Sequence, residues 1–197
     1  MVSAVLLAAG ASSRMGTHKL LLPLGGEPIV RRVARQLGAA GFGDVLVVAG
    51  HEQEAVIAAL EGLAVRHVVN PDYASGMGGS FRAAVGALDE SEAAMFALAD
   101  QPLLEAVDYR RLLDAWRANR RGIVSVRYGE ITAPPHLFGR EYFPELSALE
   151  HGARPVLRRH AAATTVLHFA PELLLDVDTP EDYERARALL GEGGNGV

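Results

Sequence analysis

Short apolar runs alternate along the chain with longer amphipathic segments. The runs are rich in β-branched and aliphatic residues, which is typical of strands that are buried on both faces. They predict central strands at Val2–Leu7, Asp44–Ala49, Val65–Val69, Ala94–Ala99 and Gly122–Val126. Strands of this kind, separated by helical segments, predict a mostly parallel sheet with helices on both faces, an α/β fold.

The segments between these runs repeat apolar residues at spacings of three and four, the period of a helix with one buried face. They predict helices at Pro28–Ala40, Gln53–Leu60, Ser80–Leu88, Val107–Asn119 and Pro180–Leu190. We expect Pro28 in the first turn of its helix, Pro180 at the first helical position, Ser80 as a helix cap, and Thr179 as the N-cap of the last helix. Residues 128–154 fit the alternation worst and predict a two-stranded or loop insertion over the active face.

Composition limits the class of protein. A chain of 197 residues with 49% apolar and 22% charged residues predicts a single globular domain, residues 1–190, followed by a loose glycine-rich tail, 191–197. The net charge of −5 disfavours nucleic acid and anionic membranes as partners. The chain has no cysteine, so disulfides and thiolate metal sites are excluded. No apolar run approaches the roughly 20 residues that span a bilayer, and we expect a cytoplasmic protein.

The loop after the first strand, residues 8–19, combines small residues with cations. In open α/β sheets, ligands bind beyond the carboxyl ends of the strands, which is where this loop lies. Gly10 and Gly16 allow backbone N–H groups to surround a phosphate, and Arg14 and Lys19 supply positive charge, so a triphosphate is the expected ligand. A flexible turn with solvated cations would have the same glycine content. The loop matches neither the GxGxxG nor the Walker A pattern.

Two acidic segments follow apolar runs. Asp100 ends the fourth predicted strand, where a carboxylate costs desolvation energy unless it has a partner or a metal ion. In "DVDT", Asp176 and Asp178 lie on one side of an extended segment and Val177 on the other. Asp178 could alternatively act only as part of the cap of the last helix.

The stretch LAAGASSRMGTHKLLLPLGGEP is very similar to the signature LAAGxSSRMGxxKLLLPxxGxP of the MobA-like nucleotidyltransferases. This resemblance implies a single-domain, Rossmann-like fold of the nucleotide-diphospho-sugar transferase type. It also implies that the loop wraps a nucleoside triphosphate and that Lys19 and Arg14 act in catalysis. The matching loop residues are Leu7, Ala8, Ala9, Gly10, Ser13, Arg14, Met15, Gly16 and Lys19.

Further matches concern the rest of the site. NPDYASGMGGSFRA resembles the segment that contacts base and ribose in the cytidylyl branch of the family, which implies nucleotide contacts for Asn70, Gly76, Met77 and Ser80. Gly78 and Gly79 would also let the backbone approach the nucleotide, although a glycine-rich turn before a capped helix explains the same residues. The resemblance implies that Asp100 and Asp178 bind Mg²⁺.

The segment PPHLFGREYFPELSALEHGARPVL resembles the acceptor side of the molybdenum cofactor cytidylyltransferases, with two departures. Leu149 and Glu150 stand where that branch has Gly-Asp, and Ala133 replaces a glycine. The resemblance implies acceptor contacts for Arg154 and Glu150, while Arg154 could equally be an ordinary surface residue.

Together these matches imply transfer of a nucleotide to a phosphate acceptor with release of pyrophosphate. CTP is favoured because the guanylyl branch usually has a second glycine in place of Ala9. The implied acceptor is molybdopterin that carries molybdenum, with a molybdoenzyme or its accessory protein as a possible partner. Three alternatives stay open: another small phosphate or sugar phosphate as acceptor, a non-catalytic cofactor carrier, and a dehydrogenase domain, which the missing GxGxxG disfavours.

Overall fold

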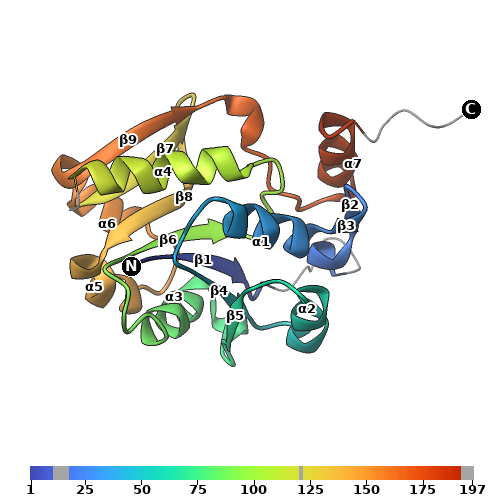
Figure 1. The fold of residues 1–197 in the computed structure, drawn as a ribbon, viewed down its shortest axis with the longest axis horizontal. Coiled ribbons are helices and arrows are strands. Elements are labelled where there is room, and N and C mark those ends of the chain that lie inside the picture. Colours follow the sequence, from blue (N-terminus) through green and yellow to red (C-terminus); the bar gives the residue numbers. More distant parts are fainter. Residues whose placement is uncertain (11–17, 120–121, 192–197) are drawn as a thin grey trace, which may run out of the picture.

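The computed structural model describes residues 1–10, 18–119 and 122–191, and within these a seven-stranded sheet forms the centre of the molecule (Figure 1). Its strand order is β5-β4-β1-β6-β8-β7-β9. The bounds are β1 Val2–Ala8, β4 Asp44–Ala49, β5 Arg66–Val69, β6 Ala93–Leu98, β7 Ile123–Tyr128, β8 Ile131–Gly139 and β9 Thr164–Phe169. Only β8 runs antiparallel to its neighbours in this sheet. The α/β class and the mostly parallel sheet are therefore confirmed.

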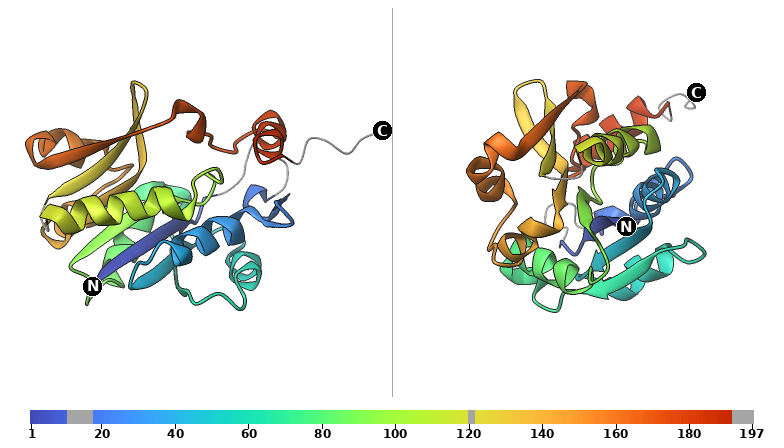
Figure 2. Two further views of the ribbon diagram at one scale, coloured as in Figure 1. Left: turned by 45° about the horizontal axis from the view of Figure 1, so that its top comes forward. Right: turned by 60° about the vertical axis from the view of Figure 1, so that its left-hand side comes forward.

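Helices cover both faces of the sheet, as Figure 2 shows from two further directions. One face carries α1 Ile29–Ala39, α2 Gln53–Ala59, α4 Ala106–Asn119 and α7 Pro180–Leu189. The other carries α3 Met77–Gly86, α5 Phe143–Ser147 and α6 Arg154–Arg159. A short hairpin of β2, Pro23–Leu24, and β3, Glu27–Pro28, leads into α1. None of the described helices is long and apolar enough to cross a membrane.

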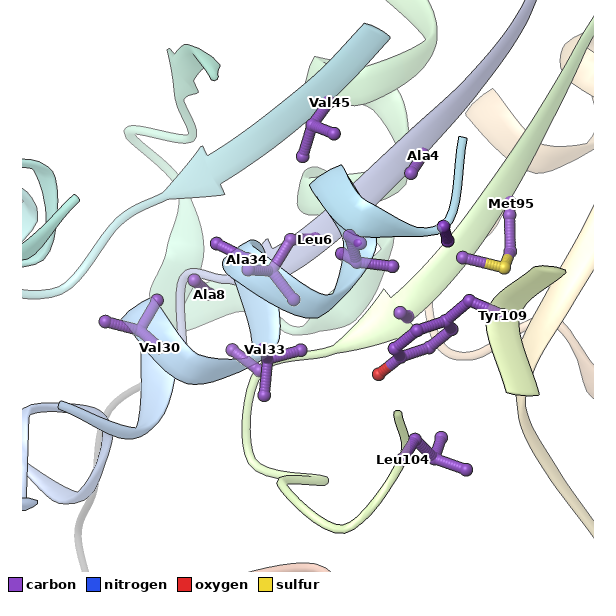
Figure 3. Packing of buried hydrophobic residues seen from close by; sticks show 14 of the residues in the cluster. Ala4, Leu6, Ala8, Val30, Val33, Ala34, Val45, Met95, Leu104 and Tyr109 are labelled. Atoms are coloured by element: carbon purple, nitrogen blue, oxygen red, sulfur yellow. The ribbon is translucent and has the colours of Figure 1, made fainter. Parts of the chain in front are cut away.

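The strand pattern divides the core into two halves. In β1 all seven residues are buried, and alternate side chains serve opposite faces because successive side chains of a strand point in opposite directions. Ala4, Leu6 and Ala8 lie under α1, where Figure 3 shows them beside Val33 and Ala34. The small residues of β1 let the helix approach the sheet closely.

Two sheet predictions were wrong. Residues 128–154 do not form an insertion over the active face, because β8 lies inside the sheet between β6 and β7. The adjacent prolines Pro134 and Pro135 obscured this strand in the sequence, since proline cannot donate a ladder hydrogen bond. The predicted central strand Val65–Val69 is instead the edge strand β5, most of whose residues are exposed. The pattern also missed β9, α5 and α6.

Some of the predicted helix ends are confirmed by the structure, and others are wrong. Thr179 caps α7 in a capping box with Asp182, and Pro180 is its first residue, as expected. Pro28 lies at the start of α1 as its N-cap, directly before the first helical residue. Ser80 does not cap α3, because that helix begins at Met77 after Gly76, whose φ of 113° a residue with a side chain rarely adopts. Of the predicted tail, residues 192–197 lie outside the described residues.

Candidate functional site

A pocket of about 250 Å³ opens at the carboxyl ends of β1 and β6, where a ligand is expected in a parallel sheet. Most of the predicted nucleotide-binding residues that the structure describes line it, from the end of β1, the turn after the first loop, the start of α3 and the end of β6. They are Leu7, Ala8, Ala9, Gly10, Lys19, Gly76, Met77 and Ser80, and the predicted metal ligand Asp100 lines the pocket with them. The predicted contacts Ser13, Arg14, Met15 and Gly16 lie outside the described residues.

Lys19 joins the two predicted metal ligands. Its Nζ donates to Asp100 Oδ2 at 2.6 Å and to Asp178 Oδ1 at 2.7 Å. These residues come from the turn before the β2–β3 hairpin, the end of β6 and the start of α7, so the fold brings together positions 159 residues apart. Burial lowers the pKa of Lys19, but the charges and hydrogen bonds of Asp100 and Asp178 outweigh it, and the pKa is raised. Lys19 is therefore a cation at neutral pH.

The sequence distinguishes Lys19 in a second way, independent of the family motif. It is the only lysine in a chain whose lysines and arginines total 19. Arginine presents a rigid planar fork, whereas lysine is a compact point charge on a flexible stem. The position between the two carboxylates is thus occupied by the only lysine of the chain.

The donor set around Asp100 fits a magnesium ion. Asp100 Oδ1 is buried without a hydrogen-bond partner among the described residues, and a buried carboxylate oxygen normally has one. No set of three or more histidine or acidic side chains within the described ranges could hold a metal ion alone. Mg²⁺ commonly binds through one or two carboxylates plus the substrate's phosphates, which matches Asp100 and Asp178.

Asn70 lies behind the pocket rather than in it. Its side chain is buried, its Nδ2 donates to Ser80 Oγ at 3.1 Å, and its Oδ1 accepts from the N–H of Asp72 at 3.0 Å. Ser80 lines the pocket, so Asn70 holds that hydroxyl in place. A direct contact between Asn70 and a nucleotide remains a prediction.

Gly78 of α3 has a structural reason that the sequence did not reveal. A Cβ on Gly78 would lie 2.1 Å from the carbonyl oxygen of Leu149, and the N–H of Gly78 donates to the carbonyl of Glu150 at 3.1 Å. Gly78 therefore admits the chain's own backbone, and an approach of a nucleotide to it remains a prediction. The side chain of Glu150 is exposed and does not line the described pockets, so its acceptor role remains a prediction.

A second pocket, of about 440 Å³, adjoins the first and shares Leu7, Met77 and Leu98 with it. Arg154, the other predicted acceptor residue, lines this second pocket. Most of its wall is apolar or aromatic: Leu7, Met77, Phe81, Phe96, Leu98, Ala133, Pro134, Phe138, Ala153 and Pro155. We call it the apolar pocket.

The sequence pattern missed His136, which lies in the wall of the apolar pocket on β8. The imidazole is buried, and its Nδ1 is 3.1 Å from Ser125 Oγ. Burial, assisted by the charge of Arg154, lowers the pKa of His136 to about 4, so the ring is neutral at pH 7. Only the placement of β8 inside the sheet could reveal this residue.

Comparison with known proteins identifies the family. Residues 4–164 match the MobA-like NTP transferase domain. The chain belongs to this family. The family signature in residues 7–28 thus agrees with a match over most of the chain, and membership makes the chain a nucleotidyltransferase-type protein with a nucleoside triphosphate as expected substrate.

Two relatives that match this family member over nearly their whole length have names that point to different chemistry. The nicotine blue oxidoreductase of Paenarthrobacter nicotinovorans is 33% identical over 196 residues, which cover 93% of this chain and 95% of the relative. The purine catabolism protein PucB of Bacillus subtilis is 32% identical and covers 94% and 96% of the two chains.

Solved structures of relatives share the fold. Rv0371c of Mycobacterium tuberculosis superposes with a TM-score of 0.82 at 30% identity and covers 95% and 97% of the two chains. A nucleotidyl transferase of Methanothermobacter gives 0.84 at 26% identity, with 96% and 97% covered. Another structure of Rv0371c is a complex with manganese, so a related protein binds a divalent metal.

Proposed function

We propose that this protein transfers a nucleotide from a nucleoside triphosphate to the phosphate of an acceptor with a planar, heteroaromatic body, and that pyrophosphate is released. One observation carries the proposal. The pocket that holds Lys19, Asp100 and Ser80 opens directly into the apolar pocket, with three residues common to both walls. A triphosphate beside the cation and a second substrate beside the aromatic residues would meet at this shared wall.

The lining of the apolar pocket favours a heteroaromatic acceptor over a sugar phosphate. A sugar exposes hydroxyl groups on all sides, and each needs a hydrogen-bond partner when it leaves water. The aromatic rings Phe81, Phe96 and Phe138 offer none, whereas they suit the face of a planar ring. Arg154 and Gln101 supply a few polar contacts that could orient such a ring. A molybdopterin-type acceptor meets this description.

The reaction requires little proton transfer by the protein. An acceptor phosphate, whose second pKa is near 6, is already anionic at pH 7, and one of its oxygens attacks the α-phosphorus. A P–O bond forms there, the bond to the bridging oxygen breaks, and pyrophosphate leaves with its electron pair. The chain's task is to align the two substrates and to stabilise negative charge, which Lys19 can do from the floor of the pocket.

Asp100 and Asp178 would hold a magnesium ion, which when bound neutralises phosphate charge. Arg14, outside the described residues, would add a second cation on the phosphates. CTP is the proposed nucleotide, on the strength of Ala9 where guanylyl transferases usually carry glycine.

A second candidate function rests on one specific finding, the relative named nicotine blue oxidoreductase. In that case the apolar pocket would hold a heteroaromatic compound that accepts a hydride from NADH or NADPH, with a proton from solvent. The pocket that we assign to the triphosphate would then hold part of the dinucleotide.

Pyrophosphate release separates these candidates. We would measure it with Mg²⁺ and each of CTP, GTP, ATP and UTP, with and without molybdopterin that carries molybdenum, and in parallel follow NADH and NADPH oxidation with nicotine blue. We expect acceptor-dependent release with CTP that is lost in Asp100→Asn and retained in Asp114→Asn, which changes an exposed aspartate of α4. Dinucleotide oxidation without pyrophosphate release would refute the transferase proposal.

A further variant tests the acceptor pocket. Gly152 lines the apolar pocket, and an added Cβ there would meet only Met77 Sδ, at 3.8 Å, so a larger side chain fits the fold but reduces the pocket. Gly152→Val should therefore raise KM for the acceptor and leave KM for the nucleotide unchanged. Equal changes in both constants would contradict the assignment of the two pockets.

A further inference from the structure

Asp176 is the one carboxylate among the described residues that line the apolar pocket. It lies in the segment before α7, which runs beside the end of β6, and the N–H of Val177 donates to the carbonyl of Asp100 at 2.9 Å. Leu175 and Val177 are buried in the core, so the alternate side chains face the other way. Asp178 thus lies beside the cation of the first pocket, and Asp176 lies in the wall of the apolar pocket.

Gln101, the residue after Asp100, holds the carboxylate of Asp176 in place. Its side chain is 2% exposed, and its Nε2 donates to Asp176 Oδ1 at 2.7 Å. An ionised carboxylate can only accept hydrogen bonds, so the amide nitrogen is the atom that faces it. The amide oxygen, Oε1, is buried without a hydrogen-bond partner among the described residues, which costs free energy. This part of the wall therefore offers more acceptors than donors.

Asp176 itself keeps unused acceptor capacity. The residue is exposed, and no described residue donates a hydrogen bond to its Oδ2. Oδ1, which accepts from Gln101, has a second lone pair. Arg154, the arginine of the same wall, forms neither a hydrogen bond nor an ion pair with this carboxylate. Both carboxylate oxygens can therefore accept a hydrogen bond from a ligand.

Two adjacent N–H donors on one edge of a planar ring match this carboxylate. An amino group beside a ring N–H presents two nearly parallel N–H bonds, the arrangement with which a guanidinium group binds a carboxylate through two hydrogen bonds. The faces of such a ring suit the aromatic side chains Phe81, Phe96 and Phe138. A carbonyl oxygen in place of the amino group would face the carboxylate with no proton between them, and both oxygens would stay unpaired.

We propose that Asp176 determines acceptor specificity, because it accepts two hydrogen bonds from an amino group and an adjacent ring N–H on the acceptor's planar body. Gln101 is a positioning residue, which acts through the carboxylate that it orients. The proposal rests on the proposed function, since the apolar pocket must be the acceptor site. The pyrimidine ring of molybdopterin carries such an edge, an amino group beside a ring N–H.

The first test compares two fluorescent probes that differ in one group. Pterin, 2-amino-4-oxopteridine, has the amino group, whereas lumazine, 2,4-dioxopteridine, has a carbonyl in its place. In fluorescence titrations of the whole protein without nucleotide, the wild type should bind pterin about tenfold or more tightly than lumazine, because a carboxylate pairs with both donors of pterin. Asp114→Asn, which changes the exposed aspartate of α4, should keep this preference.

Asp176→Asn should bind pterin about tenfold or more weakly than the wild type and lose the preference over lumazine. Asparagine keeps the shape of the side chain and the oxygen that accepts from Gln101, but its amide nitrogen can donate to the carbonyl of lumazine. Gln101→Leu should reduce the preference because the carboxylate loses its orienting hydrogen bond. An equal weakening of both probes in this variant would show that Gln101 only supports the fold, which would overturn its positioning role.

The complete reaction supplies the second test. With Asp176→Asn, KM for molybdenum-bearing molybdopterin should rise about tenfold, while KM for CTP stays near the wild-type value. The increase in Tm on addition of Mn²⁺ should equal that of the wild type, since Asp176 is assigned to the acceptor and not to the metal.

The outcomes separate the two proposals. Absence of pyrophosphate release in the wild type, together with a preference for pterin that depends on Asp176, would refute the proposed function and support the ring-edge site. Equal binding of pterin and lumazine by the wild type, or binding of neither, would overturn the assignment of Asp176. A smaller response of Asp176→Asn to Mn²⁺ with an unchanged preference for pterin would also overturn it, and would place this carboxylate at the metal.

Discussion

Replacement of Lys19 by methionine tests the charge arrangement at the centre of the site. Methionine keeps an unbranched apolar stem but removes the ammonium group that Asp100 and Asp178 share. The two carboxylates would then face the pocket without a neighbouring cation from this position. We expect the free energy of unfolding to fall, and the variant to bind divalent metal better than the wild type in the absence of nucleotide.

The size of the expected loss in the free energy of unfolding follows from the exposure of the three side chains. Removal of one partner from a buried ion pair costs about 3–5 kcal/mol, whereas exposed pairs contribute roughly 0–1 kcal/mol. Lys19 and Asp100 are 12% and 22% exposed, near the buried limit, while Asp178 is 46% exposed and is screened by water. We expect a loss of about 2 kcal/mol, which for a domain of this size lowers Tm by about 4–8 °C.

The assay is thermal unfolding of wild type and Lys19→Met at pH 7, with and without Mn²⁺ and without nucleotide. The pKa of Lys19 is raised, so its stabilising charge is fully present below the ordinary lysine pKa and is lost only as the pH rises through the higher folded-state value. At pH 7 the wild-type ammonium therefore competes with the metal. A metal at tenfold its Kd adds about 1.4 kcal/mol to the stability of the variant.

Mn²⁺ should thus raise the Tm of Lys19→Met by several degrees and that of the wild type by less. Arg82→Met, which removes an exposed cation from α3, serves as the control and should behave like the wild type in both conditions. Equal stability of variant and wild type, or an equal response of both to Mn²⁺, would refute the idea that Lys19 neutralises the metal-binding carboxylates.

Three further predictions concern other parts of the fold. His136 has a folded-state pKa of about 4, below its unfolded value near 6.5. Its contribution to the free energy of unfolding is therefore complete above pH 6.5 and is lost as the pH falls, by about 2 kcal/mol between pH 7 and pH 5. Chemical denaturation at both pH values should show this loss in wild type and in the exposed-site control His67→Gln, but not in His136→Gln. Gly78→Ala should lower the free energy of unfolding by at least about 2 kcal/mol because its Cβ would overlap the backbone of residue 149. Gly86→Ala, in the same helix with open space around it, should be neutral or stabilising by up to about 1 kcal/mol. Denaturation midpoints that agree for the two variants would contradict this expectation. Asp182→Ala removes a carboxylate oxygen that accepts three hydrogen bonds at the start of α7. The stability measured by thermal unfolding should fall by about 1–2 kcal/mol. An unchanged Tm would show that the capping box does not stabilise this end of the helix.

The central strands and most of the residues that line the pocket at the ends of β1 and β6 could be predicted from the sequence because their signals are local. The apolar runs at β1, β4 and β6 need only the period of buried strands, and the carboxyl ends of parallel strands meet at one edge of a sheet. For that reason the sequence alone suffices to place the residues after β1 and Asp100 after β6 at one site. The capping box at Thr179 is equally local, since its partner lies three residues away.

The apolar pocket depended on contacts that no local pattern encodes. β8 carries two adjacent prolines and an antiparallel direction, so its period did not reveal that it pairs Phe138 with Ala94 of β6. This pairing places His136 and Phe138 of β8 in the apolar pocket. The same strand order brings β7 beside β9, which the pattern missed.

By itself the sequence determined the α/β class, the family signature, and the prediction that the loop after β1 and the acid after β6 lie at one site, because each depends on residues that are neighbours along the chain or follow strands of one sheet. Only the tertiary structure decided that Lys19 reaches Asp178 across 159 residues and that Gly78 admits the backbone of residue 149. The physical reason is that strand order and close backbone approach are set by packing of the whole chain, whereas periodicity reports only which face of each segment is buried.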